Sequence, residues 1–130
     1  PPPLGHAYQS QAILLTAGEK GASYHVGGQT GFVPCFQSVN IVETTGAGDA
    51  FSAGFIAEAL KLLLSSKTEK GAGAGDLEGV LRAGGANEGG SGVEGMVRFA
   101  SAVGALTCCG DGAIAPQPTE EDVLNLLGRE

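Results

Sequence analysis

A lone carboxylate on a Gly-rich turn is the most chemically suggestive feature of this sequence. Residues 43–51 read ETTGAGDAF, and the apolar run AFSAGFIAEALKLLL starts directly after Asp49. A carboxylate at a helix start can act as a cap, because it accepts backbone N–H groups and suits the positive end of the helix dipole. Alternatively, the glycines let the N–H groups of Gly46, Ala47 and Gly48 face an anion, while the carboxylate accepts a proton. The local pattern leaves both interpretations open.

Short strands and a long helix are expected to position this turn. The run QAILLTAG (11–18) has the apolar composition of a buried strand and ends at a glycine. The segment GASYHVGGQTGFVPCF (21–36) predicts two strands joined as a hairpin at its Gly-Gly pair. Another strand is expected over 38–43. Apolar residues lie on nearly every side of 47–64, so we expect a largely buried helix there.

The second half of the chain alternates between low complexity and helical pattern. Glycine is dense and apolar residues are sparse at about 66–92, which predicts a flexible insertion. VEGMVRFASAVGALTCC then reads as a second apolar helix. PTEEDVLNLLGRE predicts a short helix with Thr119 as its cap, Asp122 three residues on and Gly128 at its stop.

Composition bounds the class of protein. The 130 residues allow one domain, and 42% hydrophobic against 16% charged residues suits an α/β protein with a buried sheet. The formal net charge of −7 argues against a nucleic-acid or anionic-membrane partner. No stretch is apolar for the length that a membrane span needs.

The cysteines indicate a reducing compartment. There are three, Cys35, Cys108 and Cys109, and their odd count and spacing fit neither a disulfide framework nor a zinc site. Reduced, buried thiols favour an intracellular location.

Other Gly-rich stretches do not form nucleotide fingerprints. GAGAGD (71–76) has no strand before it and no apolar helix after it, and GGQTG and GGANEGG lack the G-x-G-x-x-G spacing. The chain also has no G-x-x-x-x-G-K-[ST] loop.

Three segments resemble the ribokinase-like, or PfkB, family of carbohydrate kinases. TTGAGDAFSAGF (44–55) is similar to the family's C-terminal signature, and LLTAGEKGASYHV (14–26) to its T-x-G-x-x-G strand and turn. VRFASAVGALTCCGDGAIAPQPTEEDVLNLL (97–127) resembles its C-terminal helix, loop and closing helix. The resemblance implies a partial ribokinase-like α/β fold, in which residues 11–130 form the nucleotide-binding and catalytic part.

The resemblance also implies roles for individual residues. It makes Asp49 the base that takes a proton from a sugar hydroxyl, with the backbone of Gly46, Ala47 and Gly48 stabilising the migrating phosphoryl group. ATP and Mg²⁺ are the implied cofactors. The residues implied to bind the nucleotide are Thr16, Gly18, Gly21, Gly48 and Ser101, the last at the adenine.

Many members of that family also bind a monovalent cation, K⁺, beside the anion site. The matching positions here are Glu43, Thr45, Thr107, Gly110, Gly112 and Pro116. The family usually has aspartate where this chain has Glu43. The extra methylene displaces the carboxylate and puts the cation cage in doubt.

The family's substrate half has no counterpart in this sequence. Relatives carry upstream strands, sugar-contacting residues and an N-x-x-E motif. NIVE (40–43) spells that motif but directly abuts the catalytic turn, so we interpret it as a chance match. The expected function is ATP-dependent phosphorylation of a sugar hydroxyl, of fructokinase or ribokinase type, with the fragment alone inactive. The alternative is a non-catalytic nucleotide-binding or regulatory relic. A homodimer of the full-length protein stays open.

Overall fold

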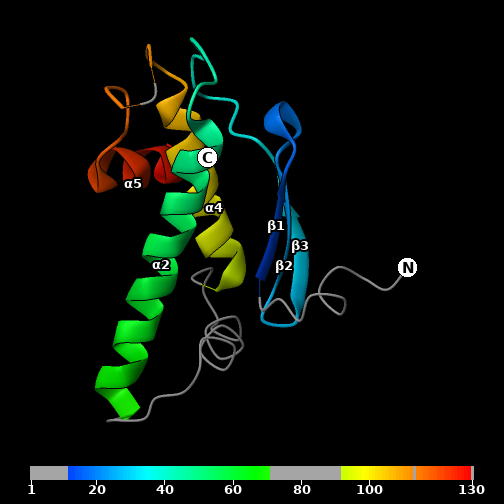
Figure 1. The fold of residues 1–130 in the computed structure, drawn as a ribbon, viewed down its shortest axis with the longest axis vertical. Coiled ribbons are helices and arrows are strands. Elements are labelled where there is room, and N and C mark those ends of the chain that lie inside the picture. Colours follow the sequence, from blue (N-terminus) through cyan, green and yellow to red (C-terminus); the bar gives the residue numbers. More distant parts are fainter. Residues whose placement is uncertain (1–11, 71–91, 113, 130) are drawn as a thin grey trace.

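The structure, a computed structural model, describes residues 12–70, 92–112 and 114–129. This part of the chain forms a three-stranded antiparallel sheet packed against helices, which confirms the α/β expectation (Figure 1). The strands, in their order across the sheet, are β1 (Ala12–Thr16), β2 (Ala22–Val26) and β3 (Gln29–Val33). The 3-10 turn η1 (Gly18–Lys20) joins the first two strands. The helices are α2 (Ala47–Lys70), α4 (Val93–Thr107) and α5 (Glu120–Arg129).

The β2–β3 hairpin forms at the expected Gly-Gly pair. Val26 and Gln29 are cross-strand partners, so the loop between them holds two residues. Gly27 and Gly28 have φ angles of 56° and 81°. Two-residue hairpin loops of this kind need left-handed backbone at both positions, which glycine adopts without steric cost. The hairpin prediction is confirmed.

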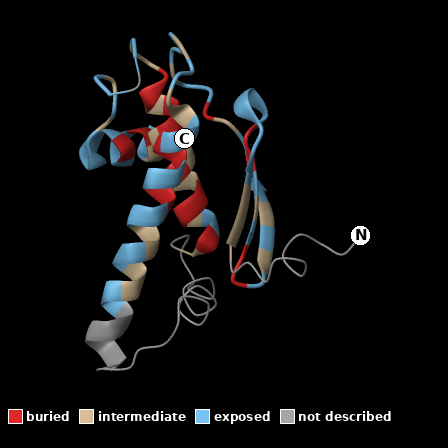
Figure 2. Ribbon diagram, in the orientation of Figure 1, coloured by how far each residue is buried: buried red, intermediate tan, exposed pale blue. Residues whose placement is uncertain are grey.

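Helix α4 is the centre of the fold. It runs antiparallel to α2 and lies between α2 and the sheet (Figure 1). Figure 2 shows buried residues concentrated along α4, whereas the strands beside it are buried only near their ends. The main core cluster joins all three parts: Ala22, Val26, Val33, Phe51, Phe55, Val93, Met96, Val97 and Ala100. Burying each large apolar side chain stabilises the fold by roughly 1.5–3 kcal/mol.

Two glycines let α2 and α4 approach closely. A Cβ added at Gly104 would lie 3.1 Å from the carbonyl oxygen of Ala47, at the start of α2. A Cβ added at Gly54 would lie 3.0 Å from a methyl group of Val103. The start of α2, which carries the GAGD sequence of residues 46–49, is therefore fixed against the last turns of α4.

Helix α5 packs against α4 and has the expected cap. Thr119 Oγ1 accepts the Asp122 backbone N–H at 3.2 Å, and the Asp122 carboxylate accepts the Thr119 N–H at 2.8 Å. This reciprocal pair is a capping box. Lys61 of α2 forms an ion pair with Glu120, which links α2 to the first turn of α5. The expected stop at Gly128 is wrong by one residue, because the helix continues through Arg129.

Strand β1 is less buried than its composition suggested. Its first three residues are half-buried, but Leu15 is 67% exposed. The strand lies at the edge of an antiparallel sheet, and within the described residues it pairs with β2 alone. The apolar run therefore reflects an edge strand with apolar surface still exposed.

The strand expected over 38–43 does not form. The segment is irregular, and the N–H groups of Val42 and Glu43 both donate to the carbonyl oxygen of Cys108, at 2.7 and 3.2 Å. These bonds satisfy donors that a strand would have given to a neighbour, and they tie the segment to the end of α4.

Helix α2 is longer and more exposed than expected. It continues to Lys70, into the segment expected to be a flexible insertion. Phe51 and Phe55 are buried, but Ile56, Leu60 and Leu64 are 56%, 52% and 61% exposed. These three residues are spaced four apart, so they form one stripe, called here the outer stripe. The prediction of a largely buried helix is wrong, because α4 covers only one face of α2.

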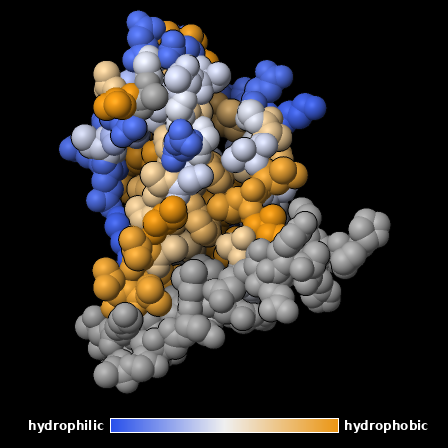
Figure 3. Space-filling model, in the orientation of Figure 1, coloured by the Kyte–Doolittle hydropathy of each residue, from blue (hydrophilic) through white to orange (hydrophobic). Residues whose placement is uncertain are grey.

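The apolar surface is broad on one side of the molecule. Figure 3 shows hydrophobic side chains gathered over the lower part of α2 and over the sheet. None of the described helices is long and apolar enough to span a membrane. The expected flexible insertion lies outside the described residues for 71–91.

Candidate functional site

The turn before α2 has the backbone geometry of an anion site. Gly46 has a φ of 82°, in the left-handed region, and the Ala47 N–H donates to the Thr44 carbonyl at 3.2 Å. The N–H groups of Gly48 and Asp49 make no backbone hydrogen bond within the described part of the chain. Free donors at a helix start attract anions. The donor set differs from the expected one, because Ala47 uses its N–H inside the turn.

Asp49 is not a helix cap in this structure. It is the third residue of α2 and is exposed, and no described residue donates a hydrogen bond to its carboxylate or forms an ion pair with it. The geometry therefore leaves the proton-accepting role open and does not support the capping role.

Gly48 has room around it. Its φ is not in the left-handed region, and a Cβ added there would meet no atom within 4 Å. The free protein therefore does not itself require glycine at this position. Gly48 faces a cavity, so a side chain there would occupy space that a ligand could use.

That cavity brings together all five of the expected nucleotide-binding residues. It has a volume of about 410 Å³, within the range of small-molecule sites. Three elements supply the expected residues: the β1–η1 turn with Thr16, Gly18 and Gly21; the start of α2 with Ala47 and Gly48; and α4 with Ser101. Asp49 does not line the cavity, and lies next to Gly48 on the exposed side.

The β1–η1 turn is held by its own backbone. Ala17 donates to the carbonyl of Gly21 at 2.8 Å, and Gly21 donates to Gly18 at 3.1 Å. Gly18 and Gly21 have φ angles of 56° and 113°. A Cβ added at Gly21 would lie 2.2 Å from the Val33 carbonyl oxygen, so no other residue fits there. The T-x-G-x-x-G pattern thus fixes a tight turn at the cavity wall.

Ser101 supplies a polar group without a partner. Its hydroxyl oxygen is buried and makes no hydrogen bond to any described residue, and the residue lines the cavity. An unpaired buried hydroxyl costs about 1–3 kcal/mol. A polar ligand in the cavity would offset that cost, which fits a nucleotide base or ribose.

The residues expected at the cation cage are only partly assembled. Glu43 Oε1 accepts the Gly112 N–H at 2.7 Å. A Cβ added at Gly110 would lie 2.8 Å from Pro116, so these two also meet. Two expected residues remain. Thr107 is buried and its hydroxyl donates a hydrogen bond to the Val103 carbonyl, whereas Thr45 is exposed in the turn. The Glu43 carboxylate is thus already hydrogen-bonded to the 110–112 loop.

Sequence reasoning missed much of the cavity wall. Three lining residues of α4 and its C-cap residue recur at helical spacing and share one face: Ser101, Gly104, Ala105 and Cys108. That spacing was a readable signal once Ser101 had been singled out. Cys35, Ile41 and Phe51 also line the cavity, and they carried no such signal, because their positions depend on tertiary packing.

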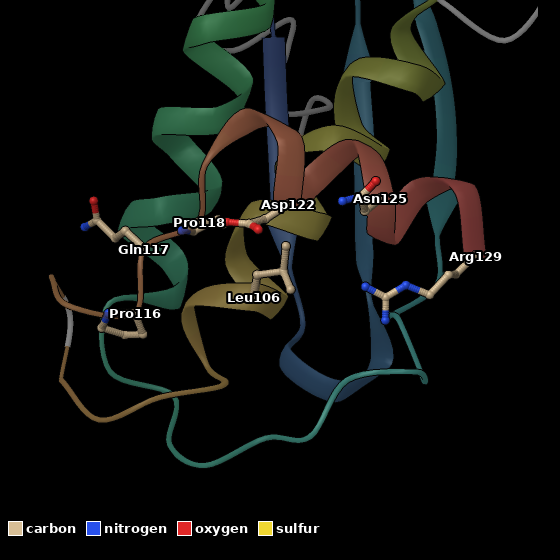
Figure 4. Close-up of a pocket in the computed structure, with 7 residues that line it drawn as sticks. All are labelled: Leu106, Pro116, Gln117, Pro118, Asp122, Asn125 and Arg129. Atoms are coloured by element: carbon tan, nitrogen blue, oxygen red, sulfur yellow. The ribbon is translucent and has the colours of Figure 1, made fainter.

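A second, smaller hollow lies away from this site. It has a volume of about 190 Å³ and lies between α5 and the Pro116–Pro118 segment (Figure 4). Asp122 and Arg129 lie at different ends of it, and the Asp122 carboxylate is already bound by Thr119. Among the expected site residues only Pro116 lines this hollow.

The described residues contain no cluster of three or more His, Cys, Asp or Glu side chains that could hold a metal ion. Mg²⁺ in phosphoryl-transfer sites uses substrate phosphates, waters and one or two carboxylates, so it does not need such a cluster.

Comparison of the sequence with known proteins identifies one family and several relatives. The model of the pfkB family carbohydrate kinases matches residues 3–120. Fructokinase-1 of Zea mays is 35% identical over 115 residues, which cover 88% of this chain and 29% of the maize protein. Ribokinase of Bacillus subtilis is 28% identical over the same length and coverage. The chain thus spans less than a third of the length of these relatives.

Structural comparison agrees with the sequence. A fructokinase with bound ATP from Xylella fastidiosa matches with a TM-score of 0.65 and 26% identity, over 92% of this chain and 32% of that one. A fructokinase double mutant from Vibrio cholerae, bound to fructose, ADP and potassium ion, matches with a TM-score of 0.64 and 22% identity, over 95% and 32%. The present fold is therefore part of a larger one. Because the family model matches residues 3–120 and the fold agrees with it, this chain belongs to the pfkB family of carbohydrate kinases.

Proposed function

We propose that this chain is the nucleotide-binding and catalytic portion of an ATP-dependent sugar kinase. The observation that carries the proposal is the cavity, which joins the β1–η1 turn, the start of α2 and the Ser101 face of α4. Two glycine turns and one unpartnered hydroxyl meet there. These groups suit different parts of a nucleotide. Backbone N–H groups would bind the phosphates, and the Ser101 hydroxyl would bind the base or the ribose.

In this proposal Asp49 is the catalytic base. Its exposed carboxylate follows the free N–H groups at the helix start, so an acceptor hydroxyl placed beside the γ-phosphate would lie within its reach. Removing the proton from that hydroxyl strengthens the nucleophile as the phosphoryl group transfers. The N–H groups of Gly48 and Asp49 would bind the phosphoryl oxygens, in which negative charge is spread.

The proposal includes two metal ions, Mg²⁺ and K⁺, which are argued from different observations. Mg²⁺ bound to the ATP phosphates would neutralise charge that develops during transfer. A structural neighbour, the Vibrio cholerae fructokinase, contains a potassium ion. Here Glu43 and the 110–112 loop are adjacent, which supports a K⁺ site. The longer glutamate side chain is the reason to test it separately.

The sugar is proposed as fructose, with ribose as the next candidate. Several of the similar curated proteins are fructokinases, and one is a ribokinase. The chain covers 29% of the maize relative, so this match does not identify the sugar by its contacts. The three free thiols support an intracellular location, and a homodimer is proposed only for a full-length protein.

The alternative function is a nucleotide-binding relic that transfers no phosphoryl group. A coupled ADP-release assay with fructose, ribose and adenosine, in Mg²⁺ and K⁺, separates the two. We expect the 130-residue chain to release no ADP above the no-sugar control, because nothing holds the acceptor in line. A full-length kinase carrying this sequence should release ADP with one sugar, and failure there would favour the relic. Sugar-dependent release by the chain alone would show that it is a complete kinase.

A further inference from the structure

Two of the three cysteines lie on the wall of the cavity. Cys35 and Cys108 line it, whereas Cys109 does not. All three are free thiols: Cys108 is buried, and Cys35 and Cys109 are partly exposed. The chain thus carries two partly exposed thiols, one at the cavity and one away from it.

The end of β3 places Cys35 beside the turn expected to bind phosphate. A Cβ added at Gly21 would lie 2.2 Å from the Val33 carbonyl oxygen and 2.9 Å from Pro34 Cα. The two residues before Cys35 are therefore pressed against the β1–η1 turn. A group attached to the Cys35 sulfur would compete for the same space as a ligand on that turn.

The two cavity thiols differ in exposure, because Cys108 is buried and Cys35 is partly exposed. Burial raises the pKa of Cys108, with the neighbouring thiols of Cys109 and Cys35 adding to the effect. The reactive form of a cysteine is the thiolate, so Cys108 should react slowly. Cys35 is more exposed, and its sulfur makes a long contact of 3.7 Å with the Phe36 carbonyl.

We propose that Cys35 is a thiol-modification site at which a covalent adduct and a bound nucleotide exclude each other. The inference rests on the proposed function, because it takes the cavity to be the nucleotide site. The natural modifier would be a low-molecular-weight disulfide. The Cys35 thiolate attacks one sulfur of the disulfide, a new S–S bond forms, and the old one breaks. The other half leaves as a thiolate, and the Cys35 proton goes to solvent, so the disulfide itself is the oxidant.

The cavity wall guides the choice of probe. Its one charged lining residue is Glu19, and an uncharged reagent keeps that carboxylate from affecting the labelling rates. N-ethylmaleimide is small and uncharged, and it reports access to each thiol. Cys109 provides an internal control, since it is partly exposed and lies off the cavity.

The test labels the 130-residue protein with N-ethylmaleimide, with and without MgATP, and measures modification of each cysteine by peptide mass spectrometry. Calorimetry on the same sample measures ATP binding independently. We expect saturating MgATP to slow Cys35 labelling at least fivefold, to leave Cys109 within twofold, and Cys108 to be the slowest of the three. Prior labelling should abolish ATP binding, and in Cys35→Ser the treated and untreated protein should bind equally well.

The outcomes separate the two claims. If ATP binds and Cys35 is labelled at an unchanged rate, Cys35 is not a competing modification site and the nucleotide proposal stands. If calorimetry shows no ATP binding, the nucleotide proposal fails and this inference fails with it. If labelled Cys35→Ser still loses ATP binding, the effect comes from another thiol and the assignment to Cys35 is wrong.

Discussion

Asp49 has an exposed carboxylate next to N–H groups that make no backbone hydrogen bond within the described residues, and the proposed phosphoryl transfer would use both. The carboxylate receives no hydrogen bond from the described residues. Ala47 and Gly46 shape the turn, and Gly48 keeps the approach to the cavity open.

Replacing Asp49 tests its role as the base. In a full-length kinase that carries this sequence, Asp49→Asn should lower kcat by several orders of magnitude and change ATP affinity less than twofold. The amide cannot accept the proton, while ground-state binding does not depend on it. Steady-state kinetics give both quantities, and Glu121→Gln, an exposed carboxylate on α5, serves as the control. Near-normal turnover in Asp49→Asn would remove it from catalysis.

Replacing Gly48 tests whether glycine at this position keeps space free for a ligand. A valine side chain has room at this position in the free protein, so Gly48→Val should change the melting temperature by only a few degrees. It should weaken ATP binding at least tenfold, because the side chain enters the cavity. Gly128→Val is the matched control, since a Cβ there also meets nothing within 4 Å and Gly128 lies on α5. Equal binding by the two variants would contradict the steric argument.

Among the elements, α5 depends on its capping box, and that makes its stability sensitive to acid. The Thr119 backbone N–H and then its hydroxyl donate to the Asp122 carboxylate, which lowers the pKa of Asp122. A folded pKa below the unfolded value contributes stability above the unfolded pKa, and that contribution is lost as pH falls through the folded pKa.

The pH dependence follows from that sign. Asp122→Ala should lower the urea midpoint by a constant amount from pH 7 to pH 5, and the difference should shrink as pH falls below about 4. Urea unfolding followed by circular dichroism measures this, with Glu121→Ala as a first-turn control that lacks the cap. A difference that persists undiminished at pH 3 would show that the cap does not act through the ionised carboxylate.

The elements that were predictable from sequence are those defined by local chemistry. The hairpin follows from Gly27-Gly28, and the α5 start follows from Thr119 and Asp122. Segment 38–43 was not predictable, because whether it pairs as a strand depends on a neighbour elsewhere in the fold. The exposure of Leu60 was not predictable for the same reason. The sequence shows which helix residues are apolar, but tertiary packing decides which of them are buried. Likewise, the place of Cys35 on the cavity wall depends on how the end of β3 packs beside Gly21.

As a whole, the molecule has the surface of a partial domain. The chain covers about 30% of its structural neighbours, and the outer stripe of α2 and Leu15 of the edge strand remain exposed. Exposed apolar patches and unpaired edges promote association.

The outer stripe should therefore limit solubility. We expect the purified chain to self-associate at tens of micromolar, and Ile56→Lys with Leu60→Lys to shift it toward monomer with little loss of stability, since both side chains are already exposed. Analytical ultracentrifugation measures the shift. Leu124→Lys is the control, because Leu124 is also exposed at 55% but lies on α5. A monomeric parent chain, or an equal effect of the control, would contradict this prediction.

The central claim is that the cavity between the β1–η1 turn, the start of α2 and α4 binds ATP. Titrating ¹⁵N-labelled chain with MgATP and following backbone amide shifts tests it most directly. The predicted result is weak, saturable binding in which Gly18, Gly21, Gly48 and Ser101 shift together while α5 stays unchanged. Saturable shifts confined to the α5 hollow with Asn125 and Arg129, or no saturable shifts at millimolar MgATP, would contradict it.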